Sequence, residues 1–514
     1  MRLLRRRAVT VGAGLAAVTA VITSICAPAA AAPVSYTVTT DPVHAAAGWV
    51  ATQFVDKTHL PAPDGDHFDS AFGGNFYPNY GENADVIFGL AAAKAARAKI
   101  DTALAYLEAN ADGYADFSKQ QGGPFDGSIG KLALAAEVAG ADPHHFAGHD
   151  LLKQLHDDEC TAVSPSCAAP GAALNIFSSV SESLVVLAEA RGGGAPSAAA
   201  LAYLTSLQCT SGGFGKDPTP CGNGAADLDA TSYAIMALAA VGGHATGIGK
   251  AVGWLKTQQK PGGYWISQNE PNANSTGLAT AALQSQGADV RAARAWLRSQ
   301  QVPAGRAGAG AIKYGGTVLA TTKSATSPSV IATAQALTGL VDGGSLATVS
   351  AKGAQAAVPV FAPATTISTR SVHPGARLTV SGAGFVAGEK LQVSIHSAST
   401  TLATAATSGL GTAQVTVTVP TTLAAGPHTV VVTGTSSGLS ASGQVTIVAA
   451  APASTAPTTS AVVAATSATP EPGTPTLAAT GQDSRRLAAL SVVGIAAVFV
   501  GAALLLLGRR RRLD

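Results

Sequence analysis

The feature that most constrains the fold is a repeat of about 50 residues that recurs six times between residues 45 and 343. Each unit pairs an amphipathic helical stretch with a stretch of mostly small, apolar residues. The amphipathic stretches carry one large apolar residue at equivalent places: Trp49, Tyr106, Leu151, Tyr203, Trp254 and Trp296. The apolar stretches are residues 85–98, 128–138, 178–190, 229–241, 275–284 and 328–341. Because a helix that is apolar nearly all round has no face for solvent, the pattern predicts an outer ring around a buried inner ring.

Two units, residues 201–243 and 252–287, carry the clearest family resemblance. Each has a Gly-rich loop between its helical stretches, at residues 212–215 and 262–265. Both units resemble the prenyltransferase/squalene-cyclase repeat. The resemblance implies an α6/α6 toroid of the terpenoid cyclase/prenyltransferase type, which we assign to residues 33–362. The family includes enzymes and pure binding proteins, so the fold alone assigns no activity.

Residues 363–448 change to an alternation of apolar and polar residues, which is typical of short strands. With Pro374-Gly375 and Gly384-Phe385, this segment resembles the Ig-like spacer modules of bacterial surface proteins. The resemblance implies a β-sandwich that acts as a spacer between the toroid and the C-terminal segment and has no catalytic role. Residues 449–476 are mostly Ala, Thr, Pro and Ser, which predicts a disordered stalk.

The C-terminal segment joins a short motif to an apolar stretch and a basic tail. The apolar stretch, residues 487–508, would span roughly 33 Å as a helix, enough to cross a bilayer. The arginines at 509–512 would keep the chain end in the cytoplasm. The motif that precedes the stretch is Leu477, Ala478, Ala479, Thr480 and Gly481. This arrangement resembles a sortase cell-wall sorting signal of the LAxTG form, a variant of LPxTG.

The resemblance implies that a sortase of the class E type cuts the chain after Thr480 and joins the new carboxyl group to a peptidoglycan precursor. The protein would then be cell-wall anchored, and it would meet the membrane only through its C-terminal helix before sorting. The alternative is a tail-anchored membrane protein that carries the motif by chance.

Residues 1–32 read as a secretory signal peptide, with early arginines, an apolar core and a small-residue cleavage zone. The chain is therefore predicted to be secreted. Without this leader and the residues after Thr480, the formal charge of +2 becomes an excess of acidic residues. No basic patch remains for a nucleic acid, and we expect no nucleic-acid partner.

Four cysteines remain after the leader in two close pairs, Cys160 with Cys167 and Cys209 with Cys221. An even number of cysteines in an exported chain favours disulfides, and local pairing is the simplest of three connectivities. Zinc ligation is the rival interpretation, but the spacings lack the CxxC pattern of a zinc knuckle.

The segment from Asp227 to Thr231 resembles the DxDDT motif of class II terpene cyclases, whose middle aspartate protonates an alkene. The resemblance implies Asp229 as a candidate acid. Ala230 stands where the family has its second consecutive aspartate, and aromatic residues are only 5% of the chain, few for a cavity that handles carbocations. The other interpretation is that Asp227 and Asp229 cap the helix that starts here.

Polar residues at the starts of the inner helices and aromatic residues in the Gly-rich loops predict a ligand mouth at one end of the ring. Oriented N–H groups there could bind a polar or anionic ligand, and aromatic rings would add flat apolar contacts. The candidate residues are Asp227, Asp229, Thr231, Phe214, Tyr264, Trp265, Asn272 and Asn274. The alternative is that the same residues are caps and loop-packing groups.

Two clusters of acidic residues and histidines are candidate metal sites. Alternate oxygens at Asp64, Asp66 and Asp69 could hold calcium, but a solvated loop is the favoured interpretation because no glutamate closes the loop. The histidines around residues 144–156 are interpreted as polar surface. We therefore predict no metal and no cofactor.

The sequence as a whole predicts a secreted, wall-anchored protein whose toroid binds a small molecule or a surface ligand without catalysis. One alternative is a secreted terpenoid-cyclase-like enzyme with Asp229 as general acid. A further alternative is a toroid that binds cobalamin beside a β domain.

Overall fold

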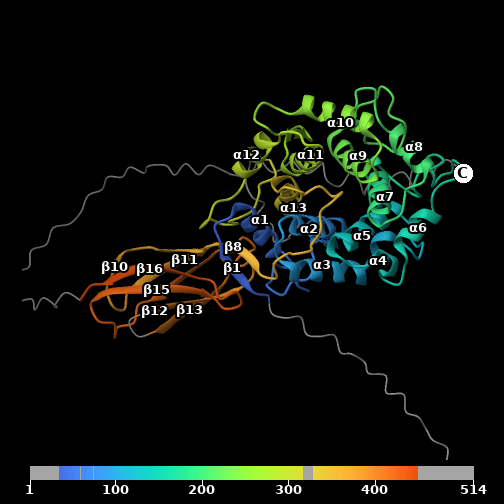
Figure 1. Cartoon of the computed structure of the whole chain (residues 1–514). Helices are drawn as coiled ribbons and strands as arrows, with labels where there is room; N and C mark the ends of the chain where they lie inside the picture. Colours follow the sequence, from blue (N-terminus) through green and yellow to red (C-terminus); the bar gives the residue numbers. More distant parts are fainter. Residues whose placement is uncertain (1–33, 58, 73–74, 316–327, 397–398, 450–514) are drawn as a thin grey trace, which may run out of the picture. The chain divides into compact units, whose positions relative to one another are not determined.

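The computed structural model describes residues 34–449, apart from residues 58, 73–74, 316–327 and 397–398 (Figure 1). The predicted signal peptide, the sorting signal and the stalk beyond residue 449 lie outside the described residues. Within the described part of the chain, no helix is both long and apolar enough to cross a bilayer.

Six helices form a closed inner ring in which each helix packs against the next and the last returns to the first (Figure 1). In ring order they are α2 (Tyr80–Ala92), α5 (Asp126–Ala139), α7 (Ser179–Arg191), α9 (Leu228–Val241), α11 (Ala273–Ser285) and α13 (Pro328–Leu340). Most of their described residues are buried. The buried inner ring predicted from the repeat is thus present.

Six further helices lie outside this ring, each packed on an inner helix. They are α1 (Pro42–Ala51), α3 (Arg97–Ala109), α6 (Leu151–Asp157), α8 (Ala198–Ser206), α10 (Ala245–Gln258) and α12 (Arg291–Ser299). A short helix α4 (Ala111–Ala115) and a 3-10 turn at Pro143–His145 lie between α3 and α6 in the sequence. The helical part is therefore a toroid of paired helices.

The boundaries of the first inner helix differ from the prediction. The helix α2 begins at Tyr80 rather than at residue 85, because the Asn79 side chain caps it by accepting from the Glu82 N–H at 3.0 Å. It ends at Ala92 rather than at residue 98, where Lys94 and Ala96 both take left-handed backbone conformations. The spacing of apolar residues predicts a helix but does not identify the residues at which it begins and ends.

Helix α1 packs against a small parallel sheet that the sequence pattern does not predict. Strand β1 (Tyr36–Thr39) pairs with β8 (Val358–Phe361), which follows the last helix of the ring. Gly48 allows the close approach, since a Cβ atom there would lie 1.4 Å from the Pro359 carbonyl oxygen. The first strand of the described chain, β1, is thereby paired with β8, which follows the helices of the toroid in the sequence.

Residues 344–351, which follow α13, cover the C-terminal end of the ring. The Arg191 guanidinium at the end of α7 donates to the carbonyl oxygens of Leu346, at 2.7 Å, and Val349, at 2.9 Å. The Leu346 N–H also faces the Met236 sulfur of α9 at 3.4 Å. This segment therefore contacts the interior of the ring at the end opposite the helix N-termini.

The rest of the described chain is β-rich. One sheet has the order β10 (Ser371–Val372), β16 (Ser440–Ile447), β15 (Gly426–Gly434), β12 (Lys390–His396), β13 (Thr400–Ala406). The other has the order β14 (Ala413–Thr418), β11 (Arg377–Ala383), β9 (Ala364–Ile367). Alternate residues such as Leu391, Val393 and Ile395 are buried, as the period-two pattern predicts.

Three short hairpins complete the described elements, each between an outer helix and the next inner helix. They are β2 (Asp69–Phe72) with β3 (Asn75–Pro78), β4 (Phe214–Gly215) with β5 (Ala226–Asp227), and β6 (Ile266–Ser267) with β7 (Glu270–Pro271). They place the loops of the repeats next to the N-termini of α2, α9 and α11.

Candidate functional site

The inner helices are capped by their own polar side chains. Asp227 accepts from the Ala230 N–H at 2.9 Å, and Asn272 accepts from the Ser275 N–H at 3.0 Å. Asn79 and Ser178 cap α2 and α7 in the same way. These caps occupy helix N–H groups that an anionic ligand would otherwise use. The capping interpretation is right for Asp227 and Asn272, and the expectation of an anion site loses support.

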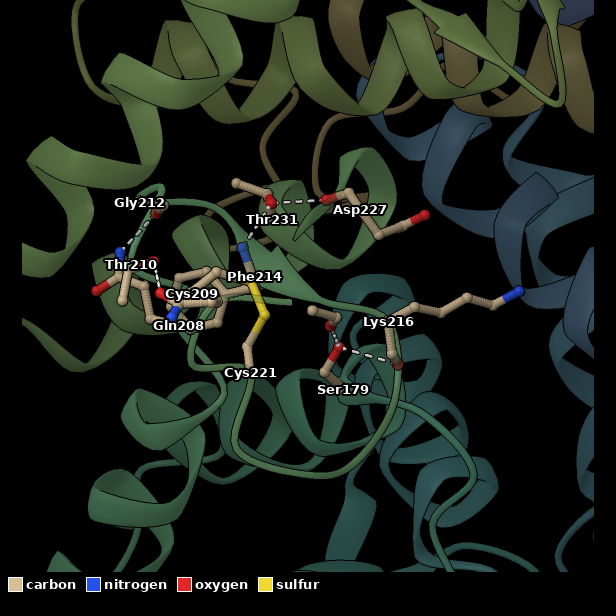
Figure 2. Close-up of a disulfide and its surroundings, with 12 residues drawn as sticks. Ser179, Gln208, Cys209, Thr210, Gly212, Phe214, Lys216, Cys221, Asp227 and Thr231 are labelled. Atoms are coloured by element: carbon tan, nitrogen blue, oxygen red, sulfur yellow. Dashed lines mark hydrogen bonds between the residues drawn. A yellow bond between two sulfur atoms is a disulfide. The ribbon is translucent and has the colours of Figure 1, made fainter. Parts of the chain in front are cut away.

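Thr231 has a structural role that repeats around the ring. Its hydroxyl accepts from the Phe214 N–H at 2.9 Å and donates to the Asp227 carbonyl at 2.6 Å (Figure 2). The residue four places after the cap accepts from a loop N–H in α2, α7 and α11 as well. These pairs are Asn83 with Phe68, Glu182 with Ala173, and Thr276 with Trp265. Thr231 therefore fastens the loop to the inner helix.

The loop aromatic residues predicted to line a mouth do not do so. Phe214 and Trp265 are fully buried, and the Trp265 indole N–H donates to the Leu255 carbonyl of α10 at 2.8 Å. Tyr264 packs on Trp296 of the outer helix α12, with ring centroids 5.3 Å apart. The prediction of exposed aromatic contacts is wrong for Phe214 and Trp265, because the Gly-rich loop folds inward between the two rings of helices.

The two cysteine pairs form the local disulfides that the spacing favours, Cys160–Cys167 and Cys209–Cys221. The second lies beside the hairpin of β4 and β5, as Figure 2 shows. In the same view the Ser179 hydroxyl of α7 donates to the Lys216 carbonyl at 3.3 Å. The disulfide closes the loop on itself, and the Ser179 contact joins the loop to α7.

Asp229 is the second residue of α9, and its environment differs from that of the capping Asp227. The residue is partly exposed, but Oδ1 is enclosed and has no hydrogen-bond partner among the described residues. Burial, and then the nearby Asp227 charge, raise the pKa of Asp229 to about 7. The Ser275 hydroxyl opposes this rise, although it makes no hydrogen bond of normal geometry. The N-cap of α9 is Asp227, and Asp229 lies in the first turn, at the positive end of the helix dipole.

One helical turn deeper, polar side chains gather among apolar neighbours. Lys131 of α5 forms an ion pair with Asp85 of α2 at 2.9 Å, and the Gln335 amide of α13 donates to Asp85 at 3.2 Å. Burial by itself would lower the pKa of Lys131. Asp85 and Tyr114 raise this pKa by more than burial lowers it, so the pKa of Lys131 lies above its ordinary value. The lysine therefore carries its proton in the interior of the ring.

Two residues of α9, Asp229 and Tyr233, are also affected by the charge of Asp85. Helices α2 and α9 are opposite in the ring order, yet the Asp85 charge acts on both Asp229 and Tyr233 of α9. Burial raises the pKa of Tyr233 well above its ordinary value, and Asp85 raises it further. We call Asp85, Lys131, Asp229, Tyr233 and Gln335 the ring-centre cluster.

Several oxygen atoms near this cluster are buried and lack a hydrogen-bond partner within the described part of the chain. They are Glu82 Oε1, Asp229 Oδ1, Asn274 Oδ1, Ser275 Oγ and Gln335 Oε1. Asn274 holds in α11 the position that Asp229 holds in α9, two residues after the cap. Burial of an acceptor without a partner costs free energy, so such groups mark a place where a donor is missing.

Sequence reasoning found Asp229 and Asn274 but missed Lys131, Tyr233 and Gln335. The sequence feature that could have identified these residues is a single charged or polar residue within a helix of small apolar residues, as Lys131 is in α5. That signal cannot show which residues meet, because the partners come from helices far apart in the sequence.

The acidic loop before α2 also differs from the interpretation as a solvated segment. Asp64 and Asp66 are exposed, but Asp69 is only 1% exposed and His67 is half-buried beneath neighbouring rings. His145 is exposed, as expected for a polar surface. The loop is therefore solvated at one end and buried at the other.

No family model matches this chain, and no curated protein matches it. Solved structures do show distant similarity. The type II terpene cyclase MstE from Scytonema is 15% identical, with 59% of this chain and 98% of that chain covered and a TM-score of 0.41. A protein from Actinoplanes is 16% identical, with 58% and 98% covered and a TM-score of 0.41.

A more distant likeness links the chain to the Candida albicans protein geranylgeranyltransferase-I complexed with GGPP, at 12% identity and a TM-score of 0.38. That similarity covers 53% of this chain and 89% of the transferase chain. The packing of the inner and outer helices by itself defines the toroid.

Proposed function

We propose that this chain is a secreted, wall-anchored protein whose helical ring binds a small polar ligand without catalysis. The observation that carries the proposal is the set of unpaired acceptors around the ring-centre cluster. A folded protein rarely buries several acceptors without donors, so a ligand that supplies donors would remove the cost.

The chemistry of the cluster favours a neutral ligand rich in hydroxyl groups. The unpaired atoms are carboxyl, amide and hydroxyl oxygens, all of which can accept a hydrogen bond, and the ammonium group of Lys131 is already paired with Asp85. An anion would meet Asp229 and Asp85 and find the helix N–H groups already capped. Sugars and other polyols present many O–H donors without charge, which suits this arrangement.

The binding proposal is tested by thermal unfolding of the full chain with a neutral disaccharide such as trehalose and with the polyamine spermidine. A ligand present at 100 times its Kd adds about 2.7 kcal/mol of stability. We expect a rise in Tm with the sugar, and a loss of affinity of about tenfold, or about 1.4 kcal/mol, in Asp229→Asn and in Gln335→Leu.

The matched control is Asp101→Asn, which removes a carboxylate from the exposed side of α3 and should leave binding unchanged. Equal binding by all variants would place the ligand elsewhere. Binding of spermidine alone, increasing as the pH rises through 7, would indicate a cation site at ionised Asp229 instead of a sugar site.

The proposed anchoring rests on the sequence of residues 477–512, with the two disulfides in agreement because they suit an oxidising compartment. In this proposal the two-sheet region is an Ig-like spacer and residues 449–476 are the stalk. Wall release by a muralytic enzyme should free covalently bound wild type, whereas Thr480→Ala should stay in the membrane fraction. Equal wall attachment of both forms would rule out the sorting signal.

A second candidate is supported by Asp229 alone. A carboxyl group whose pKa is about 7 holds a proton near neutral pH and could deliver it to an alkene, as in a cyclase. The polar neighbours Asp85 and Gln335 argue against this reaction, because they would trap a carbocation. Incubation with a linear polyprenyl substrate in deuterated water tests whether Asp229 protonates an alkene. Deuterium in a cyclic product, lost in Asp229→Asn, would establish the enzyme.

A further inference from the structure

We propose that His59, His67 and Asp69 form a binding site for one divalent transition-metal ion of the zinc type. The three residues lie in the segment between α1 and α2, and the site goes beyond the function proposed for the ring. Their candidate ligand atoms all lie within 4.8 Å of one another. Two imidazoles and one carboxylate are a common ligand set for such ions.

The distances suit a single ion. The His67 Nε2 atom is 3.1 Å from Asp69 Oδ1, and the His59 Nδ1 atom contacts the other oxygen of Asp69. Zinc binds nitrogen and oxygen at about 2.0–2.2 Å, so its ligand atoms lie roughly 3–4 Å apart in a tetrahedral site. In the proposed site, side-chain rotation would bring the three atoms to that spacing.

Asp66 gives His67 the orientation of a metal ligand. Its carboxylate accepts from His67 Nδ1, which leaves Nε2 directed at Asp69. A carboxylate on the far nitrogen is the usual outer partner of a metal-binding histidine, because it fixes the tautomer and increases the basicity of the ligand. The sequence Asp66-His67-Phe68-Asp69 therefore supplies two ligands and one supporting group.

Both imidazoles are held in place by aromatic rings. His59 stacks on Phe76 with ring centroids 4.5 Å apart, and His67 stacks on Tyr106 with centroids 4.3 Å apart. The buried Lys99 of α3 holds the preceding loop, since its ammonium group donates to the Gly65 carbonyl at 2.7 Å. Preorganised side chains lose little entropy when an ion binds.

The ligand set also selects among ions. Calcium and magnesium prefer all-oxygen sites, so two imidazoles disfavour them. Three protein ligands leave at least one position of a tetrahedral ion for water or another small ligand. The proposed ion is therefore a transition metal, whereas the acidic residues of this loop by themselves would suggest calcium.

The test uses the full chain after treatment with a chelator. Titration with Co²⁺ should give visible absorption that saturates at one equivalent, and Zn²⁺ should displace it. We expect His59→Ala and His67→Ala to weaken Zn²⁺ binding by more than about 100-fold and Asp66→Asn to weaken it by about 10- to 100-fold. The control His144→Ala/His145→Ala, which removes two exposed histidines, should bind like wild type.

Circular dichroism of each variant checks that the chain is folded. The His59 side chain is 42% exposed, so His59→Ala should keep the fold even if a change at His67 does not. Absence of saturable binding in the wild type would show that the cluster is a hydrogen-bond network only. Equal binding by wild type and His59→Ala, or loss in the exposed-histidine control, would place the metal elsewhere and overturn the proposal.

Discussion

A single buried hydroxyl shows how individual residues hold the repeat together. Thr231 is fully buried and joins the Phe214 N–H to α9, just as Thr276 joins the Trp265 N–H to α11. These bonds, together with the buried rings of Phe214 and Trp265, hold each Gly-rich loop against its inner helix.

Replacement of Thr231 by valine should destabilise the protein. The change keeps the shape but leaves the buried Phe214 N–H without its acceptor, which costs about 1–3 kcal/mol. Urea unfolding measures the loss. The control Thr210→Val removes an exposed hydroxyl that contacts Asn223 and should change stability by less than about 0.5 kcal/mol. Equal stability of both variants would contradict the structural role of Thr231.

The inner helices approach one another through glycine. A Cβ atom at Gly277 of α11 would lie 2.4 Å from the Gln335 carbonyl of α13, and one at Gly339 would lie 2.6 Å from the Gly277 carbonyl. Backbone this close leaves no room for a side chain.

Gly277→Ala should therefore destabilise the ring by about 1–3 kcal/mol, because the added methyl group forces two helices apart. The matched control is Gly253→Ala on the outer helix α10, where nothing lies within 4 Å of the added atom. There the same change should stabilise the protein by about 0.5–1 kcal/mol through helix propensity. Chemical denaturation compares them, and effects of the same sign would refute the close packing.

The loop between α8 and α9 depends on its disulfide. Cys209 and Cys221 are 12 residues apart and enclose the hairpin strand that carries Phe214. Replacement of both by alanine should cost roughly 2–4 kcal/mol, because the unfolded chain gains freedom. The control pair Cys160 and Cys167 closes a loop of 7 residues and should cost less. Thermal unfolding tests the order, and a larger loss at the shorter loop would contradict it.

For the molecule as a whole, buried carboxyl groups make stability depend on pH. Burial raises the pKa of Asp126 and Glu182 to about 8 and that of Glu137 and Glu189 to about 7. A raised pKa means that the folded state binds the proton more tightly than the unfolded state does. The stabilisation is complete below about pH 4 and is lost as the pH rises through 7 to 8.

The free energy of unfolding should thus fall between pH 5 and pH 8.5, by an amount on the order of a few kcal/mol. Unfolding at several pH values measures it. Glu182→Gln should flatten the curve, because the amide cannot ionise while its oxygen can still accept from the Ala173 N–H. A stability that rises over this range would show that these carboxyl groups are ionised in the folded protein.

Much of the helical fold was predictable because it follows from local pattern. Small apolar residues at helical spacing identify the inner helices, and Asp227 and Asn272 stand where caps are expected. The burial of Phe214 and Trp265 was not predictable, because the sequence of a Gly-rich loop with an aromatic residue does not show whether the loop faces solvent or folds inward.

The sequence by itself determined that paired helices would repeat around a ring, that strands would follow, and that close cysteines could pair, because each depends on residues near in the chain. Only the tertiary structure decided which side chains meet at the centre. Gln335 of α13 donates to Asp85 of α2 from 250 residues away in the sequence, and this pair meets because the last inner helix returns to the first. Burial of the ring-centre cluster then sets the charge of its titratable groups, since the cost of leaving water depends on neighbours that sequence distance does not specify.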